Sequence, residues 1–235
     1  MPQPQVNRIR LTAALSLALA CAPASNKGQG TESASVTRTD TAVAGSRAPT
    51  DSNITRADLA RIQGSATAPV WVIEVSDFQC PYCKQWHDQT YPALLDQYIK
   101  TGKVRMAYVN YPLSIHRHAM PAAEAAMCAG VQNKFWPMHD TLFSSQSRWE
   151  TLPNAMPTFD SLAAHLGVAM PAWRDCVARH LTRPLIEADY ARSQSAGVRS
   201  TPTFFIGDEK VEGYAPYAGF RPAIEAQLAK KSTSR

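Results

Sequence analysis

Two cysteines separated by two residues are the side chains of this 235-residue sequence best suited to chemistry: Cys80 and Cys83, with Pro81 and Tyr82 between them. A pair with this spacing can close and reopen a disulfide, or it can supply two thiolate ligands to a metal ion. Which use the sequence favours depends on the elements that hold the two sulfurs.

A buried strand and a helix are predicted on either side of this motif. Residues 70–75 (VWVIEV) form a near-continuous apolar run, typical of a central strand in an α/β sheet. A helix should begin at Pro81, since proline suits the first helical turn. Cys80 then lies at the helix N-terminus, where unpaired N–H groups and the helix dipole lower a thiol pKa. Cys83 lies one turn further on, so we expect Cys80 to be the nucleophile and Cys83 the resolving thiol.

A zinc site and a purely structural disulfide are the alternative uses of the pair. A four-cysteine zinc site would need a second close pair, and Cys128 and Cys176 are far apart. No metal-ligand spacing connects His116, His118 and His139, so packing or surface roles are expected for these histidines. The position of the motif between a strand and a helix favours redox chemistry, with no metal and no other cofactor.

The remaining elements follow from hydrophobic periodicity and from the positions of glycine and proline. Asn53 is the expected N-cap of the first helix, and Pro92 is expected to kink the second. The predicted helices cover residues 54–62, 81–100, 119–131, 135–144, 159–166, 171–180, 185–196 and 217–230, and the predicted strands cover 70–75, 103–109, 203–206 and 210–212. This order predicts one mixed α/β sheet with helices on both sides and a separate helical block.

The first 21 residues have the features of a signal peptide. Arg8 and Arg10 precede a short apolar region at 11–20, which is too short to span a bilayer. Ala18-Leu19-Ala20 has the small-x-small pattern of a cleavage site. Cys21 follows it directly, as in lipoproteins, where that cysteine is acylated and anchors the chain. Simple secretion and lipidation at Cys21 are both compatible with this pattern.

Residues 22–52 predict a disordered linker, because they contain no Leu, Ile, Phe, Met, Trp or Tyr. The 24 basic and 19 acidic residues of the chain leave a net charge of +3 once Arg8 and Arg10 are removed with the signal peptide. This charge is too small and too scattered to indicate a nucleic-acid partner. We therefore expect an exported protein of the periplasm or cell envelope, with a lipid anchor if Cys21 is acylated.

Three segments resemble the DsbA-like thiol:disulfide interchange family, in its thioredoxin-like-4 branch. Residues 74–83 (EVSDFQCPYC) are similar to the active-site segment of the family, and 197–207 (GVRSTPTFFIG) to its cis-proline segment. Residues 128–136 (CAGVQNKFW) resemble part of its helical insertion. The three segments occur in the order of the family, and the resemblance covers roughly residues 55–232.

The resemblance implies a thioredoxin fold: a mixed central sheet with flanking helices and an inserted helical domain. The thioredoxin-fold domain would comprise residues 53–116 and 197–232, and the inserted domain residues 117–196. The Thr201–Pro202 peptide would be cis and would face Cys80. Four residues would then contact the substrate: Pro81, Tyr82, Thr201 and Pro202.

The resemblance also assigns roles to Glu74 and to the other two cysteines. The family has a buried acidic residue at the position of Glu74, and a buried carboxyl group with a raised pKa can exchange a proton with Cys83. Members of the branch often carry cysteines where Cys128 and Cys176 stand, so we expect a structural disulfide between them, besides the redox-active disulfide of Cys80 and Cys83.

The dipeptide between the active-site cysteines bears on the direction of the reaction. A group that stabilises the thiolate makes the disulfide more oxidising, and strongly oxidising relatives typically have Pro-His where this chain has Pro81-Tyr82. Isomerases of this class usually need a dimerisation domain, which residues 22–52 do not form. We expect a monomeric dithiol oxidase of unfolded or partly folded exported proteins, recycled by a membrane or soluble redox partner. The alternatives are a reductase or isomerase, and a peptide-binding holdase that uses the groove around Pro202.

Overall fold

The computed structural model describes residues 52–233 of the chain. The predicted signal peptide, Cys21 and all but the last residue of the predicted linker lie outside these residues. In the described part of the chain, no helix has the length and apolarity needed to cross a membrane.

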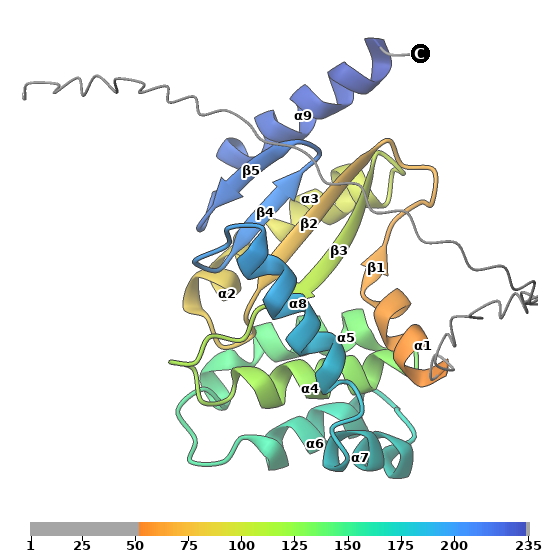
Figure 1. Cartoon of the computed structure of the whole chain (residues 1–235), viewed down its shortest axis with the longest axis vertical. Helices are drawn as coiled ribbons and strands as arrows, with labels where there is room; N and C mark the ends of the chain where they lie inside the picture. Colours follow the sequence, from red (N-terminus) through yellow and green to blue (C-terminus); the bar gives the residue numbers. More distant parts are fainter. Residues whose placement is uncertain (1–51, 234–235) are drawn as a thin grey trace, which may run out of the picture. The chain divides into compact units, whose positions relative to one another are not determined.

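A five-stranded sheet forms the centre of the described residues (Figure 1). Its strands are β1 (Ile62–Gln63), β2 (Val70–Ser76), β3 (Val104–Asn110), β4 (Thr203–Ile206) and β5 (Glu209–Glu212), in the spatial order β1-β3-β2-β4-β5. The pair β2 and β3 is parallel, and the other three pairs are antiparallel. The carboxyl ends of β2 and β3 therefore meet at one edge of the sheet, so the segments that follow them are brought together.

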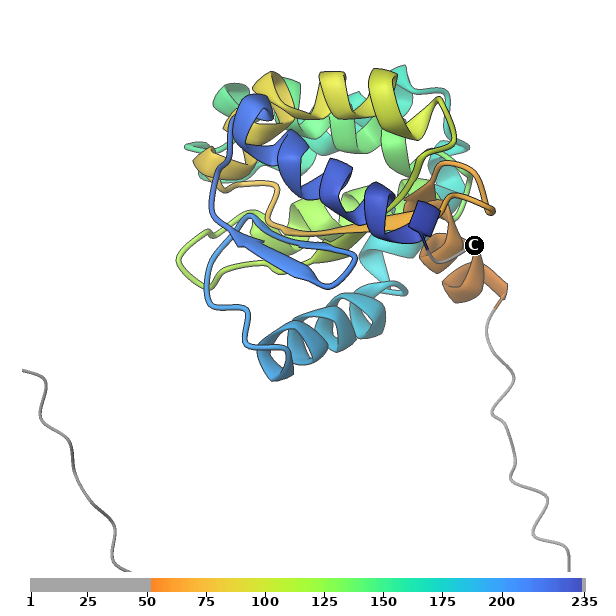
Figure 2. The ribbon, with the colours of Figure 1, turned by 90° about the horizontal axis from the view of Figure 1, so that it is seen from above.

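Helices cover both faces of the sheet. One face packs against α2 (Pro81–Gln89), α3 (Tyr91–Leu94), a π-helical turn (Leu95–Ile99) and α9 (Tyr217–Thr233). The opposite face packs against α8 (Arg183–Ser195), as the view from above shows (Figure 2). This arrangement explains why the apolar run of β2 is nearly continuous, since side chains on both of its faces are covered.

An aromatic core lies under α2 and α9. Trp86 of α2 is fully buried and packs at a tilt against Phe204 of β4 and edge-on against Phe220 of α9, with ring centroids 4.6 and 5.6 Å away. Val70 and Val72 of β2 point to the same face. Because side chains alternate along a strand, Glu74 and Ser76 also lie on this face, toward α2.

A bundle of helices follows β3 in the chain and lies at the end of the sheet that carries the carboxyl end of β2 (Figure 1). It contains α4 (Ala119–Gly130), α5 (Phe135–Ser144), a 3-10 turn (Gln146–Arg148), α6 (Met156–His165) and α7 (Met170–Ala178). A disulfide joins Cys128 of α4 to Cys176 of α7. Most alanines of α4 are fully buried, because their small side chains let the neighbouring helices approach closely.

Three local expectations differ from the structure. The first helix, α1, covers Ser52–Ala60, so Asn53 lies inside the helix rather than capping it, and Ile62 pairs with Ala107 of β3 instead of extending the helix. The helix predicted over 81–100, with a kink at Pro92, is divided at Thr90, two residues before that proline. The Thr90 hydroxyl donates a hydrogen bond to the carbonyl of Ala215, 2.9 Å away. The last helix predicted for the insertion, α8, packs on the sheet rather than only within the bundle.

The architecture as a whole confirms the predicted fold class. The sheet is mixed, helices flank both of its faces, and a helical bundle is inserted between β3 and β4. The chain therefore brings residues separated by more than 120 positions, such as Cys80 and Thr201, to the same edge of the sheet.

Candidate active site

The motif lies where β2 ends and α2 begins. A turn joins them, in which the N–H of Cys80 donates to the carbonyl of Asp77 at 3.0 Å. Cys80 is the N-cap of α2 in an extended conformation, and Pro81 occupies the first turn of the helix. The Cys80 carbonyl accepts the N–H of Lys84 at 3.1 Å, which closes the first helical turn. The Cys80 sulfur is therefore held at the N-terminal end of a helix, where the dipole favours a negative charge.

The two sulfurs have different environments. Cys80 is 3% exposed, and its thiol donates a hydrogen bond to the carbonyl of Thr201 at 3.5 Å. Hydrogen bonding with Cys83 is the main cause that lowers the Cys80 pKa to about 6, against the opposing effect of burial. Cys83 is fully buried, and burial raises its pKa well above the usual range. The pair thus has one sulfur that ionises readily and one that holds a proton.

Of the residues predicted to contact the substrate, Thr201 lies against the Cys80 sulfur through its carbonyl. The Thr201–Pro202 peptide is cis, and both residues are buried beside the motif. The Thr201 hydroxyl has no hydrogen-bond partner among the described residues. Tyr82, by contrast, is 61% exposed, so its ring is available to a bound chain.

Glu74 is fully buried on β2, next to Tyr108 of β3 and Phe204 of β4 in the sheet register. Neither of its carboxyl oxygens has a hydrogen-bond partner among residues 52–233. Burial raises the pKa of Glu74 to about 7, and the neighbouring Ser76 hydroxyl opposes part of this shift. Because the same hydroxyl also lowers the Cys83 pKa, Ser76 lies close to both groups. The carboxyl group predicted to serve Cys83 is thus buried in its vicinity.

Asp77 organises the turn before Cys80, a role that the sequence analysis missed. Its buried carboxylate accepts three hydrogen bonds: from the N–H of Gln79 at 2.8 Å, the N–H of Leu113 at 2.9 Å and Nδ1 of His116 at 2.7 Å. The segment after β3 is thereby fastened to the segment after β2. The adjacency of β2 and β3 was the available signal, since their carboxyl ends meet.

The helical bundle also supports the active-site turn. The Gln146 side chain donates to the carbonyls of Phe78 and Cys80, at 2.8 and 3.1 Å. The Gln79 side chain donates to the carbonyl of Glu150 at 2.8 Å and accepts the N–H of His118 at 2.6 Å. These contacts fix the backbone around Cys80 from the side of the insertion.

Three side chains without metal-ligand spacing in the sequence come together between α2 and α5. Nitrogen or oxygen atoms of His87, His139 and Asp140 lie within 4.8 Å of one another, the one such group found in the described residues. Asp140 accepts from Nδ1 of His139 at 2.8 Å and from Nε2 of His87 at 3.4 Å. Although burial opposes it, these hydrogen bonds hold the Asp140 pKa at about 2. The carboxylate thus joins one nitrogen of each histidine and links the two helices, while Nε2 of His139 is buried without a hydrogen-bond partner among the described residues.

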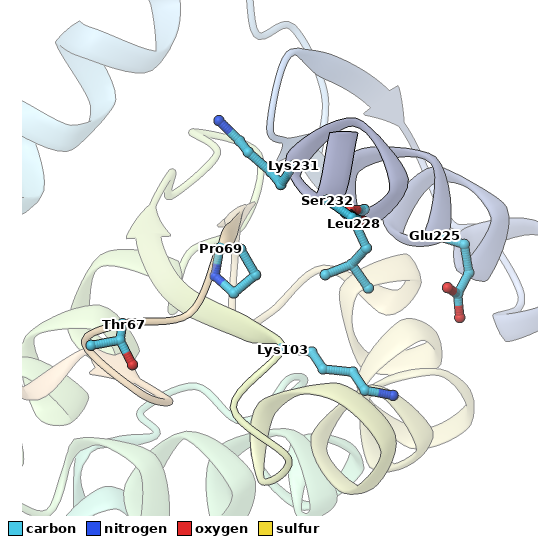
Figure 3. Close-up of a pocket in the computed structure, with 7 residues that line it drawn as sticks. All are labelled: Thr67, Pro69, Lys103, Glu225, Leu228, Lys231 and Ser232. Carbon is cyan, nitrogen blue, oxygen red and sulfur yellow. Dashed lines mark hydrogen bonds between the residues drawn. The ribbon is translucent and has the colours of Figure 1, made fainter. Parts of the chain in front are cut away.

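Two cavities bear on where a substrate could lie. A cavity of about 670 Å³ lies at the end of the sheet where β2 and β3 begin, between Pro69, Lys103 and Leu228 (Figure 3), far from the motif. A second, of about 440 Å³, lies beside the active-site turn. It is lined by Pro112, Leu113, His116, Met120, Glu187 and Tyr190, among others. The second cavity adjoins the active-site turn, because His116 in its lining contacts Asp77.

The sequence is similar to parts of larger proteins and to whole disulfide-forming proteins. It is 33% identical over 161 residues to a Na(+)/H(+) antiporter NhaA 3 of Salinispora tropica, covering 68% of this chain and 23% of that protein. The chain spans about a quarter of the length of this and a second such antiporter. It is 24% identical over 176 residues to disulfide bond formation protein D of Bacillus subtilis, covering 72% of this chain and 78% of that protein.

Solved structures have the same fold. Oxidised BdbD of Bacillus subtilis superposes with a TM-score of 0.66 at 24% identity, covering 72% of this chain and 92% of that one. Alpha-DsbA1 of Wolbachia pipientis superposes with a TM-score of 0.67 at 22% identity, covering 74% and 93%. The family model described as thioredoxin, Thioredoxin_4, matches residues 57–226. The resemblance read from three short segments is thus confirmed, and the chain belongs to this DsbA-like branch of the thioredoxin proteins.

Proposed function

We propose that this chain is a protein thiol–disulfide oxidoreductase that works as a dithiol oxidase on exported proteins. The observation that carries the proposal is the unequal pair: the Cys80 pKa is lowered to about 6, and the Cys83 pKa is raised. A stabilised thiolate at the attacking position favours the reduced form of the pair, which makes its disulfide a stronger oxidant.

The reaction can be written with its atoms balanced. A substrate thiolate attacks Cys80 of the closed disulfide, the Cys80–Cys83 bond breaks, and Cys83 leaves and takes a proton. The proposed donor of that proton is Glu74, a buried acid near Cys83. A second substrate thiolate then attacks the substrate sulfur of the mixed disulfide, and Cys80 leaves as a thiolate. The substrate has lost two electrons and the enzyme pair has gained them.

A bound chain would lie across the exposed Tyr82, the Thr201–Pro202 segment and the adjoining cavity. Substrates of this kind are unfolded or partly folded proteins with free thiols, because a folded domain would bury them. The reduced pair must then be reoxidised, so a membrane or soluble partner that accepts two electrons belongs to the proposal. The proposal also places a monomer in the periplasm or cell envelope, held there by a lipid if Cys21 is acylated. An intact mass of the mature chain tests the acylation.

The equilibrium of the pair with glutathione tests the direction. We expect a potential less negative than about −200 mV, in the range of disulfide isomerases and stronger oxidants. A value near that of thioredoxin, about −270 mV, would replace the oxidase with a reductase. The measurement uses the full mature chain, with the Cys128–Cys176 disulfide kept closed.

A trapping experiment separates exchange chemistry from simple peptide binding. Cys83→Ser keeps the attacking sulfur but cannot resolve, so it should accumulate mixed disulfides with substrate proteins. Cys80→Ser is the matched control and should trap none. Substrate protection by Cys80→Ser equal to that of the unmodified protein, with no trapping by Cys83→Ser, would identify a holdase instead.

A further inference from the structure

The Cys80 thiolate has no unpaired cationic side chain beside it on its own helix. Pro81 and Tyr82 carry no charge, and the next basic residue, Lys84, donates to Asp88 at 2.6 Å. His87 lies between Asp88 and Asp140, at 3.0 and 3.4 Å. Both ring nitrogens of His87 are therefore engaged by carboxylates, whereas a histidine with a single carboxylate contact would keep one ring N–H free.

A histidine from the segment after β3 is held next to the active-site turn instead. Nδ1 of His116 lies 2.7 Å from the carboxylate of Asp77, whose main chain also accepts the N–H of Cys80. The Asp77 carboxylate is fully buried, and the His116 ring is 17% exposed. The backbone N–H of Leu113, bonded to the same carboxylate, fixes the start of the segment that carries the ring. One buried side chain thus sets the position of His116 relative to Cys80.

We propose that His116, held by Asp77, supplies the positive charge that stabilises the Cys80 thiolate and so replaces a basic residue within the C-x-x-C motif. The ring is a positioning and electrostatic group rather than a nucleophile. With Nδ1–H donated to Asp77, the Nε2–H of the imidazolium is free, since Nε2 has no partner among the described residues. That donor lines the cavity beside the turn.

The electrostatics around His116 agree with this arrangement. Hydrogen bonding to Asp77 is the main cause that raises the His116 pKa, burial opposes it, and the negative charge of Cys80 adds to it. Coupling between two charges is reciprocal, so a cation at His116 also lowers the Cys80 pKa, in addition to the larger effect of hydrogen bonding with Cys83. His116 also offsets the buried negative charge of Asp77, which would otherwise disfavour a second anion nearby.

Other charged and titratable groups also face the ring. Arg117 follows it in the chain, and Glu187 and Tyr190 of α8 line the same cavity. Glu187 is exposed, so solvent weakens its effect on the ring. Asp77 is the partner in direct contact, and the charge on His116 is present below its raised pKa and lost as the pH rises through that value.

This inference extends the proposed oxidase function. The coupling between His116 and Cys80 does not depend on that function, but its effect on substrate oxidation does. A nearby opposite charge shifts a pKa by roughly one to three units, and we use the lower end because the His116 ring is partly exposed and is paired with Asp77. His116→Asn should therefore reduce the Cys80 thiolate fraction at acidic pH about tenfold. The equilibrium constant for oxidising substrate dithiols should fall by the same factor, equivalent to about 30 mV.

The first experiment titrates the Cys80 thiolate by its ultraviolet absorbance in three variants. His116→Asn should raise the Cys80 pKa, His116→Lys should restore the low value because it restores a cation, and His165→Asn should leave it unchanged. His165 is exposed at the end of α6, so it controls for loss of a histidine. An unchanged Cys80 pKa in His116→Asn, or no rescue by His116→Lys, would overturn the proposal.

The second experiment needs no variant, so it holds even if a substitution prevents folding. The His116 pKa is measured by NMR in the reduced protein and in the oxidised protein, where Cys80 cannot be a thiolate. We expect a higher His116 pKa in the reduced form, and equal values in the two forms would refute the coupling. A wild-type potential near that of thioredoxin, with the coupling present, would reject the oxidase while leaving the role of His116 intact.

Discussion

Replacing Glu74 by Gln should stabilise the protein at neutral pH while damaging its chemistry. Glu74 is fully buried, and neither carboxyl oxygen has a hydrogen-bond partner among the described residues. An ionised carboxylate in such a place is disfavoured, which is why the pKa rises from 4.5 to about 7. Glutamine has nearly the same shape and carries no charge at any pH.

The magnitude follows from the pKa shift of Glu74. At about 1.4 kcal/mol per pKa unit, a rise from 4.5 to about 7 corresponds to about 3 kcal/mol, taken as an upper figure. Below pH 4.5 the group is protonated in both folded and unfolded chains, so it has no effect. Between pH 4.5 and 7 the unfolded chain releases the proton and the folded chain keeps it, so stability falls as the pH rises. Above pH 7 the whole penalty is present.

Urea denaturation of the oxidised protein, repeated from pH 4 to pH 8, measures how the free energy of unfolding depends on pH. The variant Glu74→Gln should match the unmodified protein near pH 4 and exceed its free energy of unfolding by up to about 3 kcal/mol at pH 8. Glu209→Gln, an exposed substitution on β5, is the control and should show no such trend. If Glu74→Gln gives no gain that grows with pH, the carboxylate is compensated in the folded state and the reasoning is wrong.

Three further substitutions test the fold and the site. Replacing Cys128 and Cys176 together by Ala should lower the free energy of unfolding by about 4 kcal/mol in the chain-entropy model, and an unchanged urea midpoint would contradict a structural role. Asp189→Ala should destabilise by about 3 kcal/mol, because it removes the buried carboxylate that Arg61 contacts and leaves only the half-exposed Asp58. A loss below about 1 kcal/mol in urea would show that Asp58 is a sufficient partner for Arg61. Tyr82→His should raise the equilibrium constant for substrate oxidation about tenfold, because it adds a cation beside the thiolate; a constant equal to that of the unmodified protein, in the glutathione assay, would contradict this.

The main elements could be predicted because their signals are local. The apolar run at 70–75 predicts a strand that is buried on both faces. Pro81 predicts a helix start, because proline suits the first turn of a helix. The burial of Glu74 was predictable in the same way, since a single charge within an apolar strand has no route to solvent. Such features can be predicted from the residues that neighbour them in the sequence.

Other features depend on contacts that no local pattern reports. The strand β1 has only two residues, Ile62 and Gln63, and exists because β3 lies beside them. The break at Thr90 has a local signal in Pro92, but its hydrogen bond to the carbonyl of Ala215, 125 positions away, has none. Strand β1 and this contact became visible only when distant segments were placed together.

The pairing of Asp77 with His116 is an intermediate case. The two residues are 39 positions apart, and neither has a motif around it. Once β2 and β3 are recognised as parallel neighbours, however, Ser76 pairs with Asn110, and the segments after both strands must meet. The Asp77 carboxylate is then expected to pair with the His116 imidazole, because a buried carboxylate is disfavoured without a cationic partner. Predicting this pair therefore requires the topology of the sheet, because the spacing of the two residues in the sequence does not indicate it.

The proton balance of the active site links its buried acid to its unequal sulfurs. At neutral pH the reduced pair consists of a Cys80 thiolate and a Cys83 thiol, because the Cys80 pKa is lowered to about 6 and the Cys83 pKa is raised. Opening the disulfide with two electrons therefore takes up one proton, and that proton goes to Cys83. Cys83 is fully buried, so its proton must come from a neighbour rather than directly from solvent. With its pKa raised to about 7, Glu74 can hold a proton near neutral pH, which suits its proposed role as the donor to Cys83.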